Sequence, residues 1–225
     1  MPTIFWAADS TVAFNSYKTH PQVGLGQALP LYLKTDVQIK NCAINGRSTK
    51  SFIDEGRLDE IDSMIRRGDY LFIQFGHNDQ KIEDPARYAA PFTDYQTNLA
   101  RFVEVARKHG AQPLLITPIY RRHLDDNGKL KDKVHLDYPD AMLQLAQKLN
   151  VPAVDLCEKS RKLLAATDKE ITYHWFMNLA PGQFPSTPDG RQDDTHLRYE
   201  GAFQMANLLA EGLRELGEPF TSLLL

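Results

Sequence analysis

The sequence is poor in cysteine and has no long apolar run. It contains only two cysteines, Cys42 and Cys157, among 225 residues. Two are too few for a disulfide framework, and each lies in or beside an apolar segment, as buried free thiols do, which favours a reducing compartment. No stretch approaches the ~18 apolar residues that span a bilayer, and the first residues lack the pattern of a signal peptide. We therefore expect a soluble, cytoplasmic protein without a membrane partner.

An excess of basic charge is also absent. The chain has 26 Lys and Arg residues against 29 Asp and Glu residues, which gives a net charge of -3. A nucleic-acid binder normally shows a basic excess or a basic stripe. The basic pairs Arg66-Arg67 and Arg121-Arg122 are short and lie among acidic residues. These features exclude nucleic acid as the default partner.

The sequence has no internal repeat and no low-complexity tract. Its length and its 42% content of hydrophobic residues suffice for one substantial core. One long irregular segment, residues 180–192, contains three prolines and two glycines. Because only one predicted helix follows it, we interpret this segment as a functional surface loop rather than a linker. We expect residues 1–225 to form a single domain.

Short apolar segments alternate with segments of helical spacing. The apolar segments are rich in Ile, Val, Leu and Phe and predict five buried strands, at residues 3–8, 37–44, 70–75, 113–119 and 151–156. The helical spacing predicts helices at residues 52–65, 99–106, 142–149 and 199–216, the second ending near His109 and the last just before Gly217. This alternation predicts a three-layer α/β/α sandwich around a five-stranded parallel sheet.

Polar residues follow the first three predicted strands, at the edge where parallel sheets bind ligands. Ser10 comes after the first strand, Gly46 after the second and Asn78 after the third. Each position alone fits a helix cap or a turn. Together they bring a hydroxyl, a backbone amide and a carboxamide to one edge. This set supplies a nucleophile and donors for an oxyanion.

A serine nucleophile needs a base, and Asp193 and His196 lie three residues apart just after the irregular loop. At that spacing the carboxylate can hold the imidazole tautomer that accepts the serine proton. Asp132 and His135 have the same spacing. Three neighbouring lysines indicate instead that this second pair belongs to a solvated loop.

The order and spacing of these motifs resemble the four sequence blocks of the SGNH (GDSL-type) hydrolases. Within that family, the rhamnogalacturonan acetylesterase group is the nearer match. The resemblance spans nearly the whole chain. It rests on Asp9-Ser10-Thr11, Asn45-Gly46-Arg47-Ser48, Phe75-Gly76-His77-Asn78-Asp79 and Asp193-Asp194-Thr195-His196.

The resemblance implies a flavodoxin-like SGNH fold and specific residue roles. It makes Ser10 the nucleophile, His196 the base and Asp193 the orienting carboxylate. The oxyanion hole would comprise the backbone amides of Ser10 and Gly46 and the side chain of Asn78. The implied reaction is a two-step acyl transfer that needs no metal or organic cofactor. In one respect the chain departs from the family, because Ala8 stands where the family usually has glycine.

By the same resemblance we expect an esterase that removes O-acetyl groups from acetylated pectic oligosaccharides of the rhamnogalacturonan type. The alternatives are an acetylxylan esterase or other carbohydrate esterase, a lipase or thioesterase of the same fold, and a non-catalytic carbohydrate-binding module. An acyl channel for lipids would be apolar, whereas residues 173–194 are rich in Gly, Pro and polar residues. The absence of a signal peptide favours imported oligosaccharides as the substrate.

Three residues are candidate substrate contacts, each with a structural alternative. Arg47 could pair with a uronic acid carboxylate or form an internal ion pair. Trp175 could stack on a sugar ring or pack in the interior. His77 could contact substrate but is more readily interpreted as a brace for its loop. The Gly24-x-Gly26 motif lacks the third glycine and the preceding strand of a dinucleotide fingerprint, so we reject that function.

Overall fold

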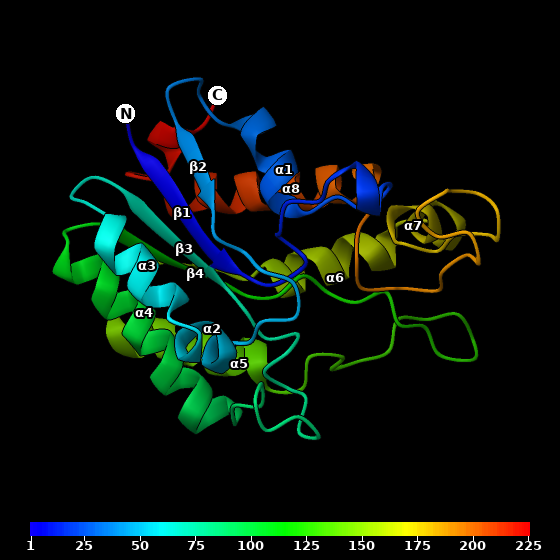
Figure 1. Cartoon of the computed structure of the whole chain (residues 1–225), viewed down its shortest axis with the longest axis horizontal. Coiled ribbons are helices and arrows are strands. Elements are labelled where there is room, and N and C mark those ends of the chain that lie inside the picture. Colours follow the sequence, from blue (N-terminus) through cyan, green and yellow to red (C-terminus); the bar gives the residue numbers. More distant parts are fainter.

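The computed structural model describes residues 1–225 and contains one five-stranded parallel sheet (Figure 1). The strand order is β2-β1-β3-β4-β5. The strands are β1 (Thr3–Ala8), β2 (Gln38–Asn41), β3 (Tyr70–Gln74), β4 (Gln112–Ile116) and β5 (Ala153–Val154). All four pairings are parallel, which confirms the predicted fold class.

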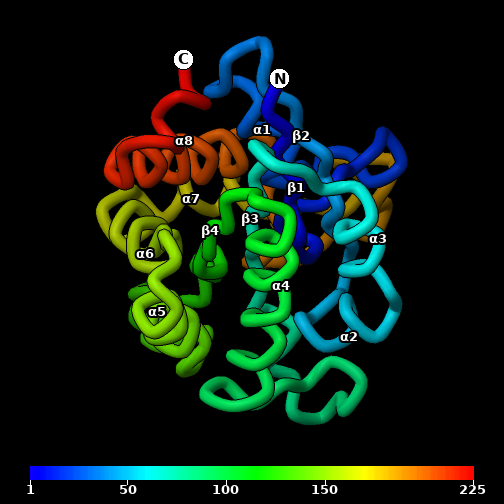
Figure 2. Tube along the Cα trace, turned by 90° about the vertical axis from the view of Figure 1, so that its left-hand side faces the viewer, coloured from blue at the N-terminus to red at the C-terminus, as the bar shows by residue number.

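Helices cover both faces of the sheet (Figure 2). The helices α1, α6 and α8 pack on one face, and α2, α3, α4 and α5 pack on the other. The helices are α1 (Leu25–Ala28), α2 (Thr49–Asp54), α3 (Arg57–Met64), α4 (Gln96–Lys108), α5 (Tyr138–Leu149), α6 (Leu156–Ala166), α7 (Lys169–Trp175) and α8 (Tyr199–Leu216). Crossing a bilayer would require a longer and more apolar helix than any of these.

The core consists of two apolar clusters separated by the sheet. Successive side chains of a strand point to opposite faces, so a strand covered on both sides must be apolar throughout. In β1, Trp6 enters one cluster, where it meets Phe72 of β3 edge to face at 5.8 Å, while Phe5 and Ala7 enter the other. This arrangement explains the unbroken apolar runs that predicted the strands.

The second strand is shorter and more exposed than predicted. The sequence predicts a buried strand at residues 37–44, but β2 is an edge strand in which Gln38 and Lys40 are exposed. An edge strand has a neighbour on one side only, and charged side chains are common there. Of the two cysteines, which are both free, Cys157 is buried and Cys42 is partly buried.

Two further differences concern helices. The helix predicted at residues 52–65 is divided into α2 and α3 at Gly56, whose φ of 72° is left-handed and ends a helix. The sequence reasoning also missed α1, α6 and α7. Helix α6 begins at Leu156, directly after its N-cap residue Asp155. The predicted helices at residues 99–106, 142–149 and 199–216 correspond to α4, α5 and α8.

Candidate active site

A tight turn after β1 presents Ser10 at the carboxyl edge of the sheet. Asp9 Oδ1 accepts hydrogen bonds from the Thr11 N–H at 2.9 Å and the Thr11 hydroxyl at 2.8 Å. These bonds fix the turn, as expected for a carboxylate at this position. Ala8 is the last residue of β1 and is extended, so its methyl group is compatible with the turn.

Ser10, His196 and Asp193 form a continuous hydrogen-bonded chain. The Ser10 Oγ lies 2.8 Å from His196 Nε2, and His196 Nδ1 lies 2.7 Å from Asp193 Oδ2. Asp193 Oδ1 also accepts from the N–H groups of Thr195 and His196. Burial opposes ionisation of Asp193, but the hydrogen bond and charge of His196 outweigh it and hold the pKa of this carboxyl well below its ordinary value. An imidazole held in this way by a carboxylate can accept the serine proton.

Two residues that sequence reasoning missed hold Asp193 in place. The Arg191 guanidinium donates to Asp193 Oδ2 and, through Nη1, to Gln22 at 3.1 Å. Asn178 Oδ1 accepts from the Asp193 N–H at 2.9 Å, and its amide donates to Asp194 at 2.7 Å. The contact between Arg191 and Asp193 had a signal in the sequence, because the two residues are only two positions apart. Asn178 carried no signal because it lies 15 residues away.

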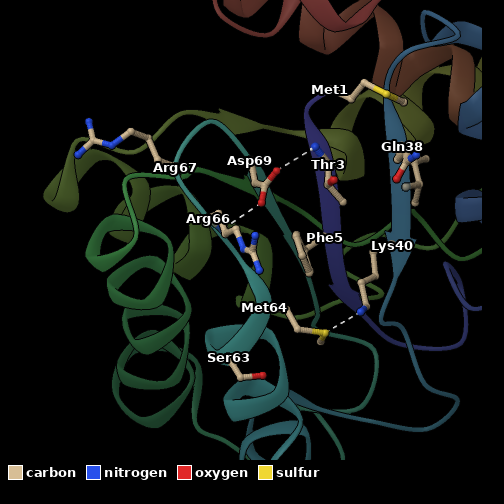
Figure 3. A pocket seen from close by; sticks show the side chains of 11 residues that line it. Met1, Thr3, Phe5, Gln38, Lys40, Ser63, Met64, Arg66, Arg67 and Asp69 are labelled. Atoms are coloured by element: carbon tan, nitrogen blue, oxygen red, sulfur yellow. Dashed lines mark hydrogen bonds between the residues drawn. The ribbon is translucent and has the colours of Figure 1, made fainter.

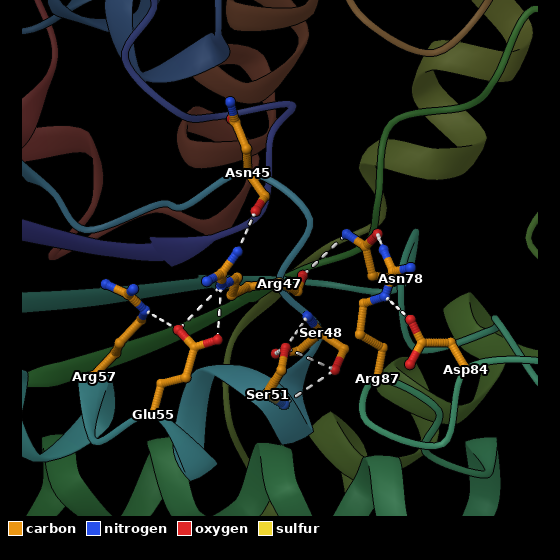
Figure 4. Close-up of polar contacts among 9 residues, drawn as sticks. All are labelled: Asn45, Arg47, Ser48, Ser51, Glu55, Arg57, Asn78, Asp84 and Arg87. Atoms are coloured by element: carbon orange, nitrogen blue, oxygen red, sulfur yellow. Dashed lines mark hydrogen bonds and ion pairs between the residues drawn. The ribbon is translucent and has the colours of Figure 1, made fainter.

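The three predicted oxyanion donors lie on the loops that follow β1, β2 and β3. The backbone N–H groups of Ser10 and Gly46 donate to no acceptor within the protein. Gly46 has a φ of 76°, which favours glycine at this turn. The Asn78 amide donates to the Arg47 carbonyl at 3.0 Å with one hydrogen, which leaves the second free, and Asn78 Oδ1 lies 3.4 Å from Arg87 Nη1 (Figure 4).

His77 is buried and braces its loop against the Ser10 turn. Its Nδ1 lies 3.0 Å from Asp9 Oδ2 and its Nε2 lies 3.2 Å from the Ile119 carbonyl. Burial raises the pKa of Asp9, but His77 and Thr11 act in the opposite direction and the pKa is lowered overall. The ring therefore contacts protein atoms on both sides, as the bracing interpretation predicts.

The interpretation of His135 as part of a solvated loop is wrong. The neighbouring lysines are exposed, but His135 is only 1% exposed and packs edge to face on His77 at 4.8 Å between ring centroids. Burial lowers the pKa of His135 well below its ordinary value. A charged loop can thus bury one ring that faces inward, which composition alone does not reveal.

The other two candidate substrate contacts are also engaged within the protein. Arg47 pairs with Glu55 at 3.0 Å and donates to the Asn45 carbonyl at 2.9 Å (Figure 4). Trp175 is 7% exposed and belongs to the apolar cluster under α8. The contacts of Arg47, Trp175 and His77 correspond to the structural alternatives, an ion pair, a packed ring and a brace.

Asp79 joins the loop after β3 to helix α2. Its Oδ1 accepts from the Thr49 N–H at 2.9 Å and from the Thr49 hydroxyl, whereas its Oδ2 is buried without a hydrogen-bond partner. Burial raises the pKa of Asp79 to about 7. A protonated Oδ2 agrees with this environment, because a buried charged oxygen without a donor would be costly.

A surface pocket of about 740 Å³, whose lining residues are drawn in Figure 3, lies away from this site. It is lined by Thr3 and Asp69, at the amino ends of β1 and β3, whereas Ser10 follows the carboxyl end of β1. Parallel sheets bind ligands at the carboxyl edge, so chemistry rather than volume identifies the candidate site. Nowhere in residues 1–225 do three or more His, Cys, Asp or Glu side chains form a group that could hold a metal ion.

Comparison with known protein families identifies the family of this chain. The model of the GDSL-like lipase/acylhydrolase family matches residues 9–202, from the Ser10 turn to the first turn of α8. The chain belongs to this family. Membership confirms the resemblance to the SGNH (GDSL-type) hydrolases and the predicted class of enzyme, a hydrolase of carboxylic esters.

Two relatives from Bacillus subtilis (strain 168) match nearly the full chain. The rhamnogalacturonan acetylesterase RhgT is 41% identical over 216 residues, covering 96% of this chain and 91% of the relative. The probable rhamnogalacturonan acetylesterase YesY is 41% identical over 218 residues, covering 97% of this chain and 95% of the relative. These matches confirm the predicted similarity to the rhamnogalacturonan acetylesterase group.

Two solved structures share the fold of this chain. The protein YxiM from Bacillus subtilis has a TM-score of 0.81 at 25% identity, over 97% of this chain and 57% of that one. A catalytic mutant of Axe2, an acetylxylan esterase from Geobacillus stearothermophilus, has a TM-score of 0.62 at 15% identity. The match covers 97% of this chain and 95% of that one. The second likeness concerns the fold alone.

Proposed function

We propose that this protein is a serine esterase that releases acetate from acetylated oligosaccharides of the rhamnogalacturonan type. The observation that carries the proposal is the hydrogen-bonded chain from Ser10 through His196 to Asp193, at the same sheet edge as three donors suited to an oxyanion. The substrate class is supported by the names of the two relatives that are 41% identical over almost the whole chain. The domain that carries out the reaction comprises residues 1–225.

The reaction proceeds in two steps. His196 Nε2 takes the Ser10 proton as Oγ attacks the acetyl carbonyl carbon, and the N–H groups of Ser10, Gly46 and Asn78 stabilise the oxyanion. The bond between the carbonyl carbon and the sugar oxygen breaks, and His196 returns the proton to that oxygen. Water then attacks the acetyl-enzyme, gives its proton to His196, and acetate leaves as Ser10 recovers its hydrogen. Asp193 holds the required tautomer throughout.

Substitution of Ser10 by alanine tests the mechanism. We expect Ser10→Ala to lower kcat on an aryl acetate by at least about 10³-fold, because the covalent route is lost. Ser63→Ala is the matched control, since Ser63 is exposed on α3 and lies at the pocket on the other edge of the sheet. Ser10→Ala activity close to that of the wild type would contradict the mechanism.

A panel of acetylated substrates tests the substrate class. We expect faster acetate release from rhamnogalacturonan oligosaccharides than from xylo-oligosaccharides, and a steep loss of activity from acetyl to butyryl esters. The acyl preference follows from the polar loop at residues 180–192, which offers no apolar channel. A preference for butyryl esters would indicate a lipid esterase or thioesterase instead. Failure of an organophosphonate to label Ser10 would favour a non-catalytic binding module.

A further inference from the structure

Most arginines in the loops at the carboxyl edge of the sheet are neutralised by acidic partners. Arg121 and Arg198 are the exceptions, because no carboxylate oxygen lies within 4.0 Å of either guanidinium. The paired arginines are Arg47 with Glu55, Arg87 with Asp84, Arg122 with Asp194, and Arg191 with Asp193. Arg121 is therefore a free cation beside the candidate active site.

Arg121 lies next to residues 75–79, the loop after β3 that carries Asn78, which we term the oxyanion loop. It follows β4, and its Nη2 donates to the His77 carbonyl at 3.1 Å, one residue before Asn78. Its Nε is buried without a hydrogen-bond partner. Burial lowers the pKa of Arg121, and the more distant charges of Asp9 and Asp193 only partly offset this. A partly buried guanidinium with unused donors is costly in free energy unless an anion joins it.

Lys81 adds positive charge on the same side of the site. Its N–H donates to the Asn78 carbonyl at 3.2 Å, so its turn follows the oxyanion loop directly. Its ammonium group also has no acidic partner within 4.0 Å. Burial and the neighbouring charges of Arg87 and Arg121 lower the pKa of Lys81. The local charge beside Asn78 therefore favours an anionic ligand, although the whole chain carries a net charge of -3.

Arg198, near His196, also has an unpaired guanidinium, and its Nε and Nη1 are buried without a hydrogen-bond partner, but it differs from Arg121 in lying against an aromatic ring. Its guanidinium lies over the ring of Phe184, 5.8 Å from the centroid. A cation over an aromatic face has an attractive partner. Arg121 has no such ring, and it alone of the two contacts the oxyanion loop.

We propose that Arg121 binds the carboxylate of a uronic acid residue in the acetylated oligosaccharide, close to the acetyl group that is removed. The inference rests on the proposed function and names the group of the substrate that is recognised. Guanidinium matches the planar carboxylate with two parallel donors, a geometry that neutral sugars cannot exploit. The sequence suggested this role for Arg47. Because Arg47 is paired with Glu55, we assign the role to Arg121 instead.

The test compares two acetylated oligosaccharides that differ only in the uronic acid, one with free carboxylates and one with methyl-esterified carboxylates. Acetate release gives kcat/KM for each. We expect the wild type to prefer the free acid by about tenfold to 100-fold, in line with a charge-assisted hydrogen bond. Arg121→Met should reduce this ratio to about one, mainly by raising KM on the acid, and Arg121→Lys should retain part of it.

Arg101→Met is the matched control, because Arg101 is exposed on α4 and loses the same charge. It should leave the ratio unchanged. Equal losses on both substrates in Arg121→Met, or an unchanged ratio, would overturn the inference. Equal wild-type rates on both substrates would overturn it while leaving the proposed function intact. Absence of acetate release from either substrate would overturn the proposed function and this inference with it.

Discussion

At the scale of single residues, the contacts of Asn78 determine which way its carboxamide faces. The oxygen accepts from Arg87 and the amide donates to the Arg47 carbonyl. The reverse orientation would set the amide against a guanidinium and the oxygen against a carbonyl, which neither partner could satisfy. The second amide hydrogen is therefore presented in a fixed direction, as electrostatic stabilisation of an oxyanion requires.

This fixed donor makes Asn78→Ala informative. We expect kcat on an aryl acetate to fall by about 10²-fold to 10³-fold with little change in KM, because the donor acts on charge that develops in the transition state. Steady-state kinetics at saturating substrate measure the effect. Asn207→Ala is the control, since Asn207 bonds Glu211 on the surface of α8. A kcat within about threefold of the wild type would remove Asn78 from the oxyanion hole.

At the scale of elements, the position of His196 depends on the junction between α7 and α8. The Arg198 N–H donates to the Trp175 carbonyl at 2.8 Å, and the Met177 N–H donates to the His196 carbonyl at 2.9 Å. Gly201 allows this close approach, because a Cβ there would lie 2.3 Å from the Trp175 carbonyl oxygen. The glycine is required by the contact between backbones rather than by a left-handed turn.

Gly201→Ala should therefore separate the two helices. We expect the free energy of unfolding to fall by about 1–3 kcal/mol, as for other overpacked sites, and esterase activity to decrease as the His196 loop shifts. Urea denaturation and aryl acetate kinetics measure both effects. The control is Gln204→Ala, at an exposed position of the same helix. A variant as stable and as active as the wild type would show that the junction tolerates the methyl group.

At the scale of the whole molecule, Asp79 couples folding to protonation. The unfolded chain releases this proton near its ordinary pKa of 3.8, whereas burial raises the folded-state pKa to about 7. The folded state binds the proton more tightly. The stability that it contributes is therefore complete below about pH 4 and is lost as the pH rises through about 7.

Asp79→Asn keeps the side chain neutral at every pH and should remove this loss. We expect the stability of the variant relative to the wild type to increase as the pH rises from about 4 to about 7. Denaturant midpoints of the variant and the wild type across that range measure the difference in stability. Groups that titrate in both proteins contribute equally to each and therefore cancel. Asp126→Asn, at an exposed loop position, is the control. A difference independent of pH would show that Asp79 is ionised in the folded protein throughout.

Local signals predicted the fold class, which the structure confirms, and the five residues of the candidate site, which the structure brings to one edge of the sheet. Unbroken apolar runs identify strands covered on both faces, and helical spacing identifies the helices between them. Ser10, Gly46 and Asn78 each follow a strand, and parallel strands bring their carboxyl ends to one edge, so their meeting followed from the strand pattern. The spacing of Asp193 and His196, together with the family motif, added the base and its carboxylate. His196 bonds Ser10 across 186 residues of the chain.

The partners of individual side chains were decided only by the tertiary structure. The place of β2 at the edge of the sheet depends on residues far apart in the chain. The same holds for the packing of His135 on His77. Arg121 and the His77 carbonyl, for example, are separated by 44 residues. The sequence determines which chemistry is present and at which edge it gathers, because those signals are local. Burial arises from long-range packing and appears only in the folded chain.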